Sequence, residues 1–349
     1  MKRYIGKIVM LMVVCGSLSA CNEKPPETIV YETETLMTET VEETFIETTE
    51  EPETETETEV ETEPETWNMD MVEEVIEIEG LTKEYSYFYL TDMHIVTESD
   101  ANDKEAAAYA TERAPLFVNA QGESSVTQFE NRIAEINRVK PDGALFGGDF
   151  IDSPSDSNLA YLGEKLGTLE VPYLYTPGNH DWTYPWAYMD RKGKKEYLPK
   201  LYPFMQNNPS IQTMENDEFI IVSIDNSTNQ IAPEAMEGYK EVLQKGKPVI
   251  VMLHVPLFSE NLPEEKSAVW KSAVTLGGGI HGGIYPNAVS EEFINLTKAD
   301  DSPVVAVLTG HVHFYHKEML NEKIVQIGGG AGYLGEATLI RFVPKEEKK

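Results

Sequence analysis

The chain has 349 residues, two cysteines and a formal net charge of −32. Such an excess of carboxylates disfavours binding to nucleic-acid duplexes and to anionic membrane surfaces, because both are themselves negatively charged. Setting aside the three basic residues of the first twenty and the −16 of residues 22–66, residues 67–349 still carry −19. Their densest basic run, RKGKK at 191–195, is short and is interpreted as a solvated loop surface.

Residues 1–20 have the pattern of a secretory signal peptide. Three basic residues precede a short apolar stretch at residues 8–14, and the segment ends Leu-Ser-Ala-Cys. This stretch is shorter than the about 20 residues that a membrane-spanning helix needs. The ending resembles a bacterial lipobox, which implies cleavage before Cys21 and a lipid on Cys21. We therefore expect an extracytoplasmic lipoprotein anchored to the membrane at the cell surface, with a plain secretory signal or an uncleaved anchor as the alternatives.

Residues 21–66 begin with Cys21 and continue as a low-complexity tract. Residues 22–66 hold 17 Glu, 13 Thr and a single Lys. Few apolar side chains and many like charges predict a disordered acidic tether rather than a folded module. The folded domain is expected in residues 67–349. Cys15 would leave with the signal peptide, so no disulfide can form within one mature chain.

Apolar runs alternate with segments of helical periodicity over most of the remaining chain. This alternation predicts an α/β fold, and the continuous Val/Ile/Leu runs predict strands buried on both faces. In chain order the predicted elements are a strand at 85–90, a helix at 128–140, a strand at 143–148, a helix at 157–169, strands at 171–175 and 219–225, a helix at 233–245, a strand at 248–253, a helix at 288–298, and strands at 303–309, 323–327 and 337–343.

Short signatures rich in histidine and aspartate follow five of these predicted strands. Because ligands of α/β sheets bind at the carboxyl ends of strands, we expect the signatures to gather at one edge. They contain imidazole, carboxylate and amide groups but no thiolate, a mixture that suits two ions of Mn, Fe or Zn. The signatures are Asp92-Met-His94, Gly148-Asp149-Phe-Ile-Asp152, Gly178-Asn179-His180-Asp181, His254 within LHVP, and Gly310-His311-Val-His313.

The order of the signatures resembles that of the calcineurin-like metallophosphoesterase superfamily, over roughly residues 84–343. The resemblance implies a β-sandwich flanked by helices, with ligands on loops at the carboxyl ends of strands. It also implies one metal bound by Asp92, His94 and His313, a second bound by Asn179, His254 and His311, and Asp149 bridging the two.

The same resemblance implies a reaction, the hydrolysis of phosphate mono- or diesters by a metal-bridging hydroxide. His180 resembles the histidine that acts as general acid. Asp152 resembles its acidic partner, which orients the imidazole and raises its pKa. Asp181 fits a turn-capping carboxylate at least as well as a catalytic role. Asp92 and His94 are two residues apart, as are His311 and His313, so in a strand-like segment each pair would point the same way.

The local sequence departs from two branches of the superfamily. Asp152 is followed by Ser-Pro where Ser/Thr protein phosphatases have Arg-Gly, and Asp181-Trp182 replaces the Glu-Phe-Asp of secreted 5′-nucleotidases. We therefore expect a single-domain phosphoesterase of broad type. The alternative is a non-catalytic metal-binding surface protein that retains the fold, which the complete ligand set disfavours. The motifs do not determine the substrate, the metals or the oligomeric state.

Several residues near the signatures have a structural and a functional interpretation. His281, in the glycine-rich segment 277–283, and His316 are interpreted as structural, with a substrate contact as the alternative for His281. The segment 328–332 is interpreted as a close-packed turn beneath the metal site, because no helix start follows it as a nucleotide-binding loop requires. The aromatic residues that follow the third signature fit the core or a substrate platform; they are Trp182, Tyr184 and Trp186, with Pro185 among them.

Overall fold

The computed structural model describes residues 71–97, 104–183, 190–206, 208–262, 274–281 and 283–346. The predicted signal peptide, Cys21 and the Glu/Thr tract lie outside these ranges. No helix within them combines the length and the apolar character that a bilayer crossing requires.

One sheet holds the first part of the described chain together with its last strand. The strands β2, β3 and β4 run parallel, whereas β11 is antiparallel to β2 and pairs in parallel with β1 at the edge. In spatial order the strands are β1 (Met71–Ile78), β11 (Ala337–Pro344), β2 (Tyr85–Leu90), β3 (Gly143–Phe146) and β4 (Tyr173–Tyr175).

The other sheet is built from the second half of the chain. Its four central strands are parallel, and the two edge strands, β5 and β9, are antiparallel to their neighbours. In spatial order the strands are β5 (Ile211–Glu215), β6 (Ile220–Ile224), β7 (Val249–Met252), β8 (Val304–Thr309), β10 (Val325–Gly328) and β9 (His316–Met319).

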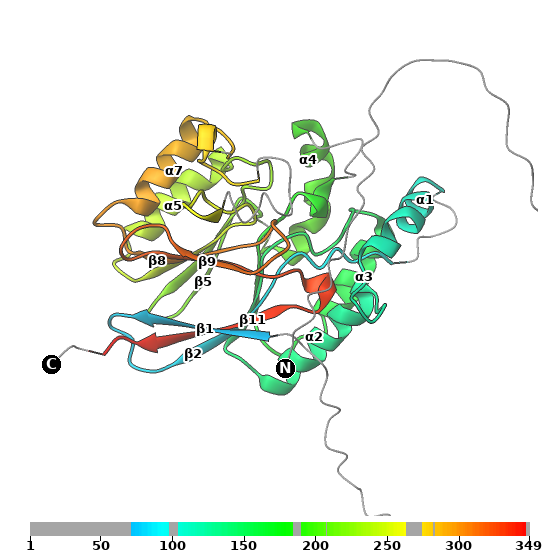
Figure 1. The fold of residues 1–349 in the computed structure, drawn as a ribbon, viewed down its shortest axis with the longest axis horizontal. Helices are drawn as coiled ribbons and strands as arrows, with labels where there is room; N and C mark the ends of the chain where they lie inside the picture. Colours follow the sequence, from blue (N-terminus) through cyan, green and yellow to red (C-terminus); the bar gives the residue numbers. More distant parts are fainter. Residues whose placement is uncertain are drawn as a thin grey trace, which may run out of the picture. The chain divides into compact units, whose positions relative to one another are not determined.

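The two sheets face each other across an apolar core. Tyr87 and Leu145 of the first sheet share this core with Ile250 and Leu308 of the second, and all four side chains are buried. The layers of strands are visible in Figure 1, with β1, β2 and β11 in one and β5, β8 and β9 in the other. The central strands are buried on both faces, as their continuous apolar sequences predict.

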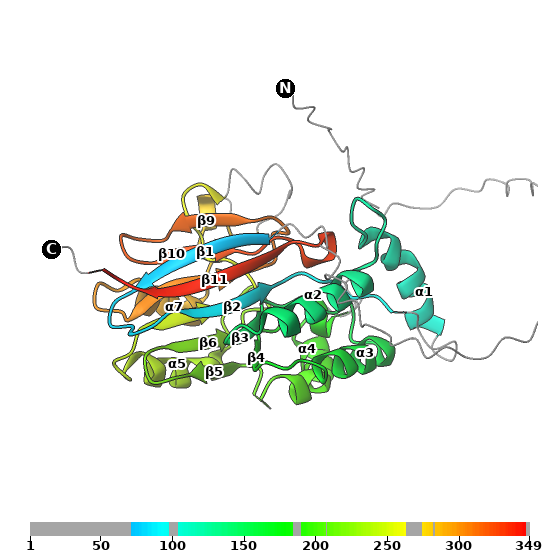
Figure 2. The ribbon, with the colours of Figure 1, turned by 90° about the horizontal axis from the view of Figure 1, so that it is seen from below.

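Helices cover the outer face of each sheet. The helices α2 (Ser125–Val139) and α3 (Asp156–Leu166) pack on the first sheet (Figure 2), where Phe129 of α2 meets Phe150 with ring centroids 5.6 Å apart. The helices α5 (Met236–Leu243) and α7 (Ala288–Lys298) pack together on the second (Figure 1). The arrangement is therefore helices, sheet, sheet, helices, which confirms the predicted sandwich.

The sequence explains why α2 begins where it does. The Ser124 side chain accepts a hydrogen bond from the Thr127 amide at 3.2 Å, which caps the helix. Phe129, Ile133 and Ile136 then follow at helical spacing and are all buried. The helix is thus amphipathic, and its apolar side faces the first sheet.

Several elements were not predicted from the sequence, namely β1, β5, β9, α1 (Lys104–Arg113) and α4 (Arg191–Tyr197). The interpretation of RKGKK as a loop was wrong, because this run lies within α4. The Asp190 side chain caps α4 by accepting from the Gly193 amide at 2.7 Å. Short 3₁₀ segments lie at Ala114–Leu116, His180–Trp182, Leu198–Phe204, Pro233–Ala235, Gly279–His281 and Gly332–Leu334.

Candidate metal centre

The signature residues follow strands that are neighbours in space. Asp92, Asp149 and Asn179 come after β2, β3 and β4, which are adjacent in the first sheet. His254 and His311 come after β7 and β8, which are adjacent in the second sheet. The carboxyl ends of these strands meet, as expected from the sequence.

Three groups of potential metal ligands form where the loops meet. One consists of His94, Asp152 and His180, and the other two, called the first and second groups below, share Asp149. In the first group, the Nε2 atoms of His94 and His313 are 3.0 Å apart, and His313 Nε2 is 3.4 Å from Asp92 Oδ1. In the second, His254 Nε2 is 3.1 Å from Asp149 Oδ2 and 3.2 Å from His311 Nδ1. Asp149 belongs to both groups and would hold both ions if two are bound.

These distances fit the coordination of metal ions. Nitrogen ligands about 2.0–2.1 Å from one ion lie about 3–3.4 Å apart when the angle between them is square or tetrahedral. Asn179 adds a further donor, because its buried Oδ1 has no hydrogen-bond partner among the described residues. A buried carbonyl oxygen left without a partner is costly, and a cation would remove that cost. The donor set therefore fits the metal ions that the sequence predicted.

Backbone strain is concentrated at five of the seven candidate ligands. Their φ angles are positive, a conformation that non-glycine residues rarely adopt and that costs about 1–3 kcal/mol each. The values are 53° for Asp92, 44° for His94, 53° for Asp149, 73° for His311 and 58° for His313. The expectation of strand-like segments was therefore wrong here. These side chains converge because the loops are left-handed at the ligands, and such strain persists only where packing imposes it.

Hydrogen bonds beyond the ligands fix which ring nitrogen is available. His254 Nδ1 lies 2.9 Å from the Gly147 carbonyl and His94 Nδ1 lies 3.0 Å from Asp152 Oδ1, so both rings donate through Nδ1. Their Nε2 atoms are left for a metal. His311 differs, because its Nδ1 faces the second group. The Asp92 carboxylate also accepts from the His311 amide at 2.9 Å, which joins the loops of the two sheets.

His180 forms a close pair with Asp152 beside the first group. His180 Nδ1 lies 3.0 Å from Asp152 Oδ1, the oxygen that also faces His94. Burial, the largest influence, disfavours the charged imidazole, but the charges of Asp149 and Asp152 outweigh it and raise the pKa of His180. The His180 side chain is 16 % exposed, whereas Asp152 is completely buried. Of this pair, only His180 is accessible to a substrate.

Arg113 completes this arrangement, although no sequence signature indicated it. Its Nε donates to Asp152 Oδ2 at 2.6 Å and a terminal nitrogen donates to Oδ1 at 2.8 Å. Although burial opposes ionisation, the hydrogen bonds from Arg113, His180 and His94 hold the pKa of Asp152 well below its usual range. Arg113 lies at the end of α1, far from Asp152 in the sequence, and no motif contains it. An arginine does stand beside the second aspartate of G-D-x-x-D, but it comes from another part of the chain.

Asp181 is a structural carboxylate in this geometry. It is completely buried and accepts hydrogen bonds from the amides of Gly178 at 2.7 Å, Asp149 at 3.0 Å and Phe150 at 2.8 Å, and from the Tyr175 hydroxyl at 2.8 Å. Burial and the neighbouring Asp149 raise its pKa to about 6. Asp181 therefore ties together the two loops that carry Asp149 and Asn179, as a turn-capping role requires.

The remaining histidines and Trp182 lie outside both groups. His316 is buried near Ser259 and Glu318, and His281 is exposed beside Phe258. Trp182 is buried and donates to the Ser227 hydroxyl at 2.9 Å, so it belongs to the core rather than to a platform. The other aromatic positions, 184–186, lie outside the described residues.

The glycine-rich turn at 328–332 packs beneath the first metal group. The Gly332 amide donates to the Thr91 carbonyl at 2.9 Å, directly before Asp92. A Cβ atom on Gly332 would lie 2.8 Å from that carbonyl, and one on Gly329 would lie 2.7 Å from the Thr91 side chain. Only glycine fits at either position, which agrees with the close-packed turn predicted from the sequence.

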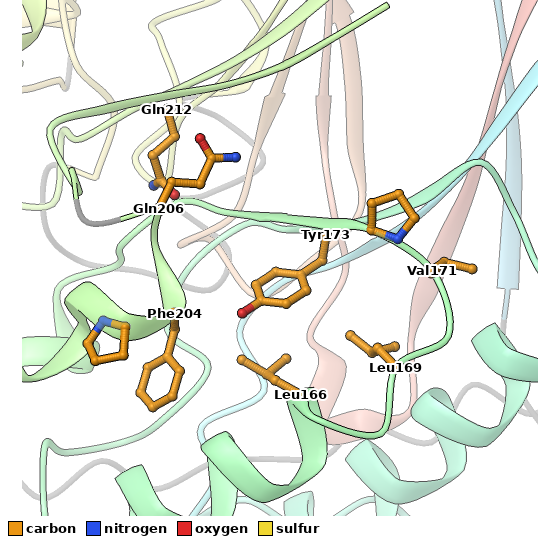
Figure 3. A pocket seen from close by; sticks show the side chains of 9 residues that line it. Leu166, Leu169, Val171, Tyr173, Phe204, Gln206 and Gln212 are labelled. Atoms are coloured by element: carbon orange, nitrogen blue, oxygen red, sulfur yellow. The ribbon is translucent and has the colours of Figure 1, made fainter.

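A cavity of about 390 Å³ opens at the edge of the first sheet, between the end of α3, β4 and Leu198–Phe204 (Figure 3). Its lining contains no charged side chain and none of the candidate ligands; it includes Leu166, Leu169, Tyr173, Phe204, Gln206 and Gln212. The cavity is therefore separate from the candidate metal groups.

The fold and the paired ligand groups define the chain as a metallophosphoesterase-type hydrolase. The profile of the Calcineurin-like phosphoesterase family matches residues 87–315, and the chain belongs to this family. A probable glycerophosphodiester phosphodiesterase, GpdQ, of Arcobacter nitrofigilis is 26% identical over 135 residues, which cover 36% of this chain and 46% of that protein. The match thus spans less than half of the relative's length.

Two solved structures are similar to this chain at lower sequence identity. A dimetal phosphatase from Danio rerio is 12% identical, with 71% of this chain and 88% of that chain covered and a TM-score of 0.44. The purple acid phosphatase PPD1 from yellow lupin (Lupinus luteus) seeds is 14% identical, with coverages of 78% and 48% and a TM-score of 0.44.

Proposed function

We propose that this protein hydrolyses phosphodiesters outside the cytoplasm with two bound metal ions and with His180 as general acid. The observation that carries the proposal is the pair of ligand groups that share Asp149, with the accessible imidazole of His180 beside them. A protein that only retained the fold would have no need of strained ligand loops together with an oriented acid–base pair.

The candidate ligands divide between two metal ions according to their positions. Asp92, His94 and His313 would hold one ion, Asn179, His254 and His311 the other, and Asp149 both. When bound, such ions supply a nucleophile at neutral pH and neutralise the phosphoryl oxygens. The donors contain no thiolate, so Mn, Fe and Zn all suit them.

The other residues position and move a proton. His180 Nδ1 is held by Asp152, so Nε2 is the nitrogen that reaches the substrate. In the protonated ring, Nε2 donates its proton to the leaving oxygen. The buried Asp152 carboxylate stabilises the charged ring, and Arg113 fixes the orientation of that carboxylate.

Two observations favour diesters over monoesters. The relative from Arcobacter nitrofigilis carries the name of a phosphodiesterase. In addition, Arg113 directs two donors to Asp152 and is not available as a clamp for phosphate. A monoester dianion has more charge to neutralise than a diester monoanion, so the loss of a clamp disfavours the monoester.

The activity is tested by comparing bis-p-nitrophenyl phosphate with p-nitrophenyl phosphate. The purified full chain is stripped of metal by a chelator and assayed before and after Mn²⁺ is restored. We expect restored diester cleavage that is lost in Asp149→Ala. Preferential monoester cleavage would refute the diester assignment, and failure to bind metal would refute the metal centre.

The extracytoplasmic location rests on the lipobox-like ending at Cys21 and on the acidic tract that follows it. A long chain of like charges extends and would hold the domain away from the membrane. Labelling of cells with radioactive palmitate is expected to mark the wild-type protein but not Cys21→Ala. Equal labelling of both proteins would exclude this anchor.

A further inference from the structure

The basic run RKGKK contributes to a second cavity, of about 500 Å³. This volume lies in the range of small-molecule sites, about 300–1,000 Å³. Arg191, Lys194 and Lys195 of α4 line it, together with Asp225, which follows β6, and Glu234. None of the candidate metal ligands lines this cavity.

The three cations differ in how their charge is used. Lys194 Nζ is 2.5 Å from Asp225 Oδ2, whose carboxylate is buried, and lies 5.7 Å from the Trp182 ring. Arg191 and Lys195 form no ion pair with any residue that the structure describes, Glu234 included. Two cations without an acidic partner beside a cavity are unexpected in a domain with this excess of carboxylates. They are available to an anion.

The wall of this cavity also supports the metal centre. Asp225 Oδ1 accepts from the Ser227 hydroxyl at 2.6 Å, and Ser227 accepts from Trp182, in the same short 3₁₀ turn as His180. Between them, Asn226 Oδ1 accepts from the amide of the candidate ligand His254 at 3.0 Å. Asp225 therefore borders the cavity, while the adjacent Asn226 and Ser227 contact His254 and the turn that carries His180.

We propose that this cavity binds a second anionic group of the substrate, a phosphate or carboxylate on the portion that keeps the phosphate, through Arg191 and Lys195. The proposal rests on the phosphodiesterase function proposed above. A guanidinium can bind such a group with two parallel hydrogen bonds, and a nearby ammonium adds charge. The short connection through residues 225–227 favours an extended substrate over a separate ligand.

The test compares p-nitrophenyl phosphodiesters whose second alkyl group ends either in a methyl or in a carboxylate, in a series of increasing chain length. At the length that reaches the cavity, we expect wild-type kcat/KM to be about tenfold higher for the carboxylate, which corresponds to about 1.4 kcal/mol, because hydrogen bonds to charged groups are stronger than those between neutral groups. The preference should vanish in Arg191→Gln/Lys195→Gln. It should persist in the matched control Lys192→Gln, which changes an exposed lysine of α4 that does not line the cavity.

A second measurement separates this proposal from the proposed activity. Calorimetric titration of the metal-free full chain with citrate needs no catalysis, and binding is expected in wild type and Lys192→Gln but not in the double variant. Equal citrate binding by wild type and the double variant would overturn the anion site. Citrate binding at the cavity without a carboxylate preference at any chain length would overturn the substrate role. If neither ester is hydrolysed but citrate binding depends on Arg191 and Lys195, the proposed function fails while the anion site stands.

Discussion

Replacing Arg113 with methionine tests whether a residue outside every signature controls the acid–base pair. The change keeps the apolar stem of the side chain but removes both hydrogen bonds to Asp152. Removing one partner of a buried ion pair costs about 3–5 kcal/mol, because the other charge stays buried and unpaired. Arg113 is 11% exposed, and His94 and His180 still face Asp152, so we expect about 3 kcal/mol, the lower end of that range.

The assay is urea unfolding of the metal-free protein combined with diester hydrolysis by the metal-loaded protein. We expect an additional fall of about tenfold in kcat, because an unheld Asp152 orients His180 less well. Arg113→Lys should recover part of both losses, since an ammonium restores the charge but not the two-bond geometry. In a double-mutant cycle, Arg113 and Asp152→Asn should couple by about 0.5–3 kcal/mol. A stability change below about 0.5 kcal/mol and no coupling would refute the reasoning.

Three further predictions concern other parts of the structure. His180→Asn should lower kcat about 10²–10⁴-fold for diesters with alkyl leaving groups. The loss should be far smaller for p-nitrophenyl esters, because p-nitrophenolate leaves without a proton. Equal losses for both kinds of ester would exclude His180 as the general acid. Gly148→Ala should lower the melting temperature far more than Gly246→Ala, although both glycines have positive φ. A Cβ atom at Gly148 would lie 2.7 Å from His254 Nδ1, whereas one at Gly246 would have no atom within 4 Å. Similar losses in the two variants would contradict this prediction. Burial lowers the pKa of Lys298, so the charged form is disfavoured in the folded protein. Lys298→Met should therefore raise stability in urea at neutral pH, and this gain should shrink as pH rises above the lowered pKa. An unchanged urea midpoint would count against this prediction.

The strands that support the candidate metal centre were predictable because they are continuous apolar runs. The strands β3, β6 and β7 are buried at every residue, and their runs of four or five residues are too short for a typical buried helix. The edge strands gave weaker signals. In β1, Glu74 is buried beside Lys317 while Val75 is exposed, so charge pairing with another strand overrides the hydrophobic pattern. β9 has the sequence HKEM, which carries almost no apolar signal.

The role of α4 could not be recognised from its basic composition. The run RKGKK is typical of a solvated surface, and nothing in it indicates that Lys194 pairs with the buried Asp225. Arg113 was missed for the same reason, because its importance comes from Asp152, 39 residues away. Contacts between distant segments form only when the sheets bring them together, so a local pattern does not record them.

The sequence by itself determined the types of the candidate ligands, their order and their positions after strands, because metal chemistry limits the possible donors and each signature is local. Only the tertiary structure decided how three similar aspartates divide their work. Asp149 lies between the two ligand groups, Asp152 holds two imidazoles and Arg113, and Asp181 binds backbone amides. A carboxylate takes its role from the donors and charges around it, and those come from loops of both sheets that meet only in the folded protein.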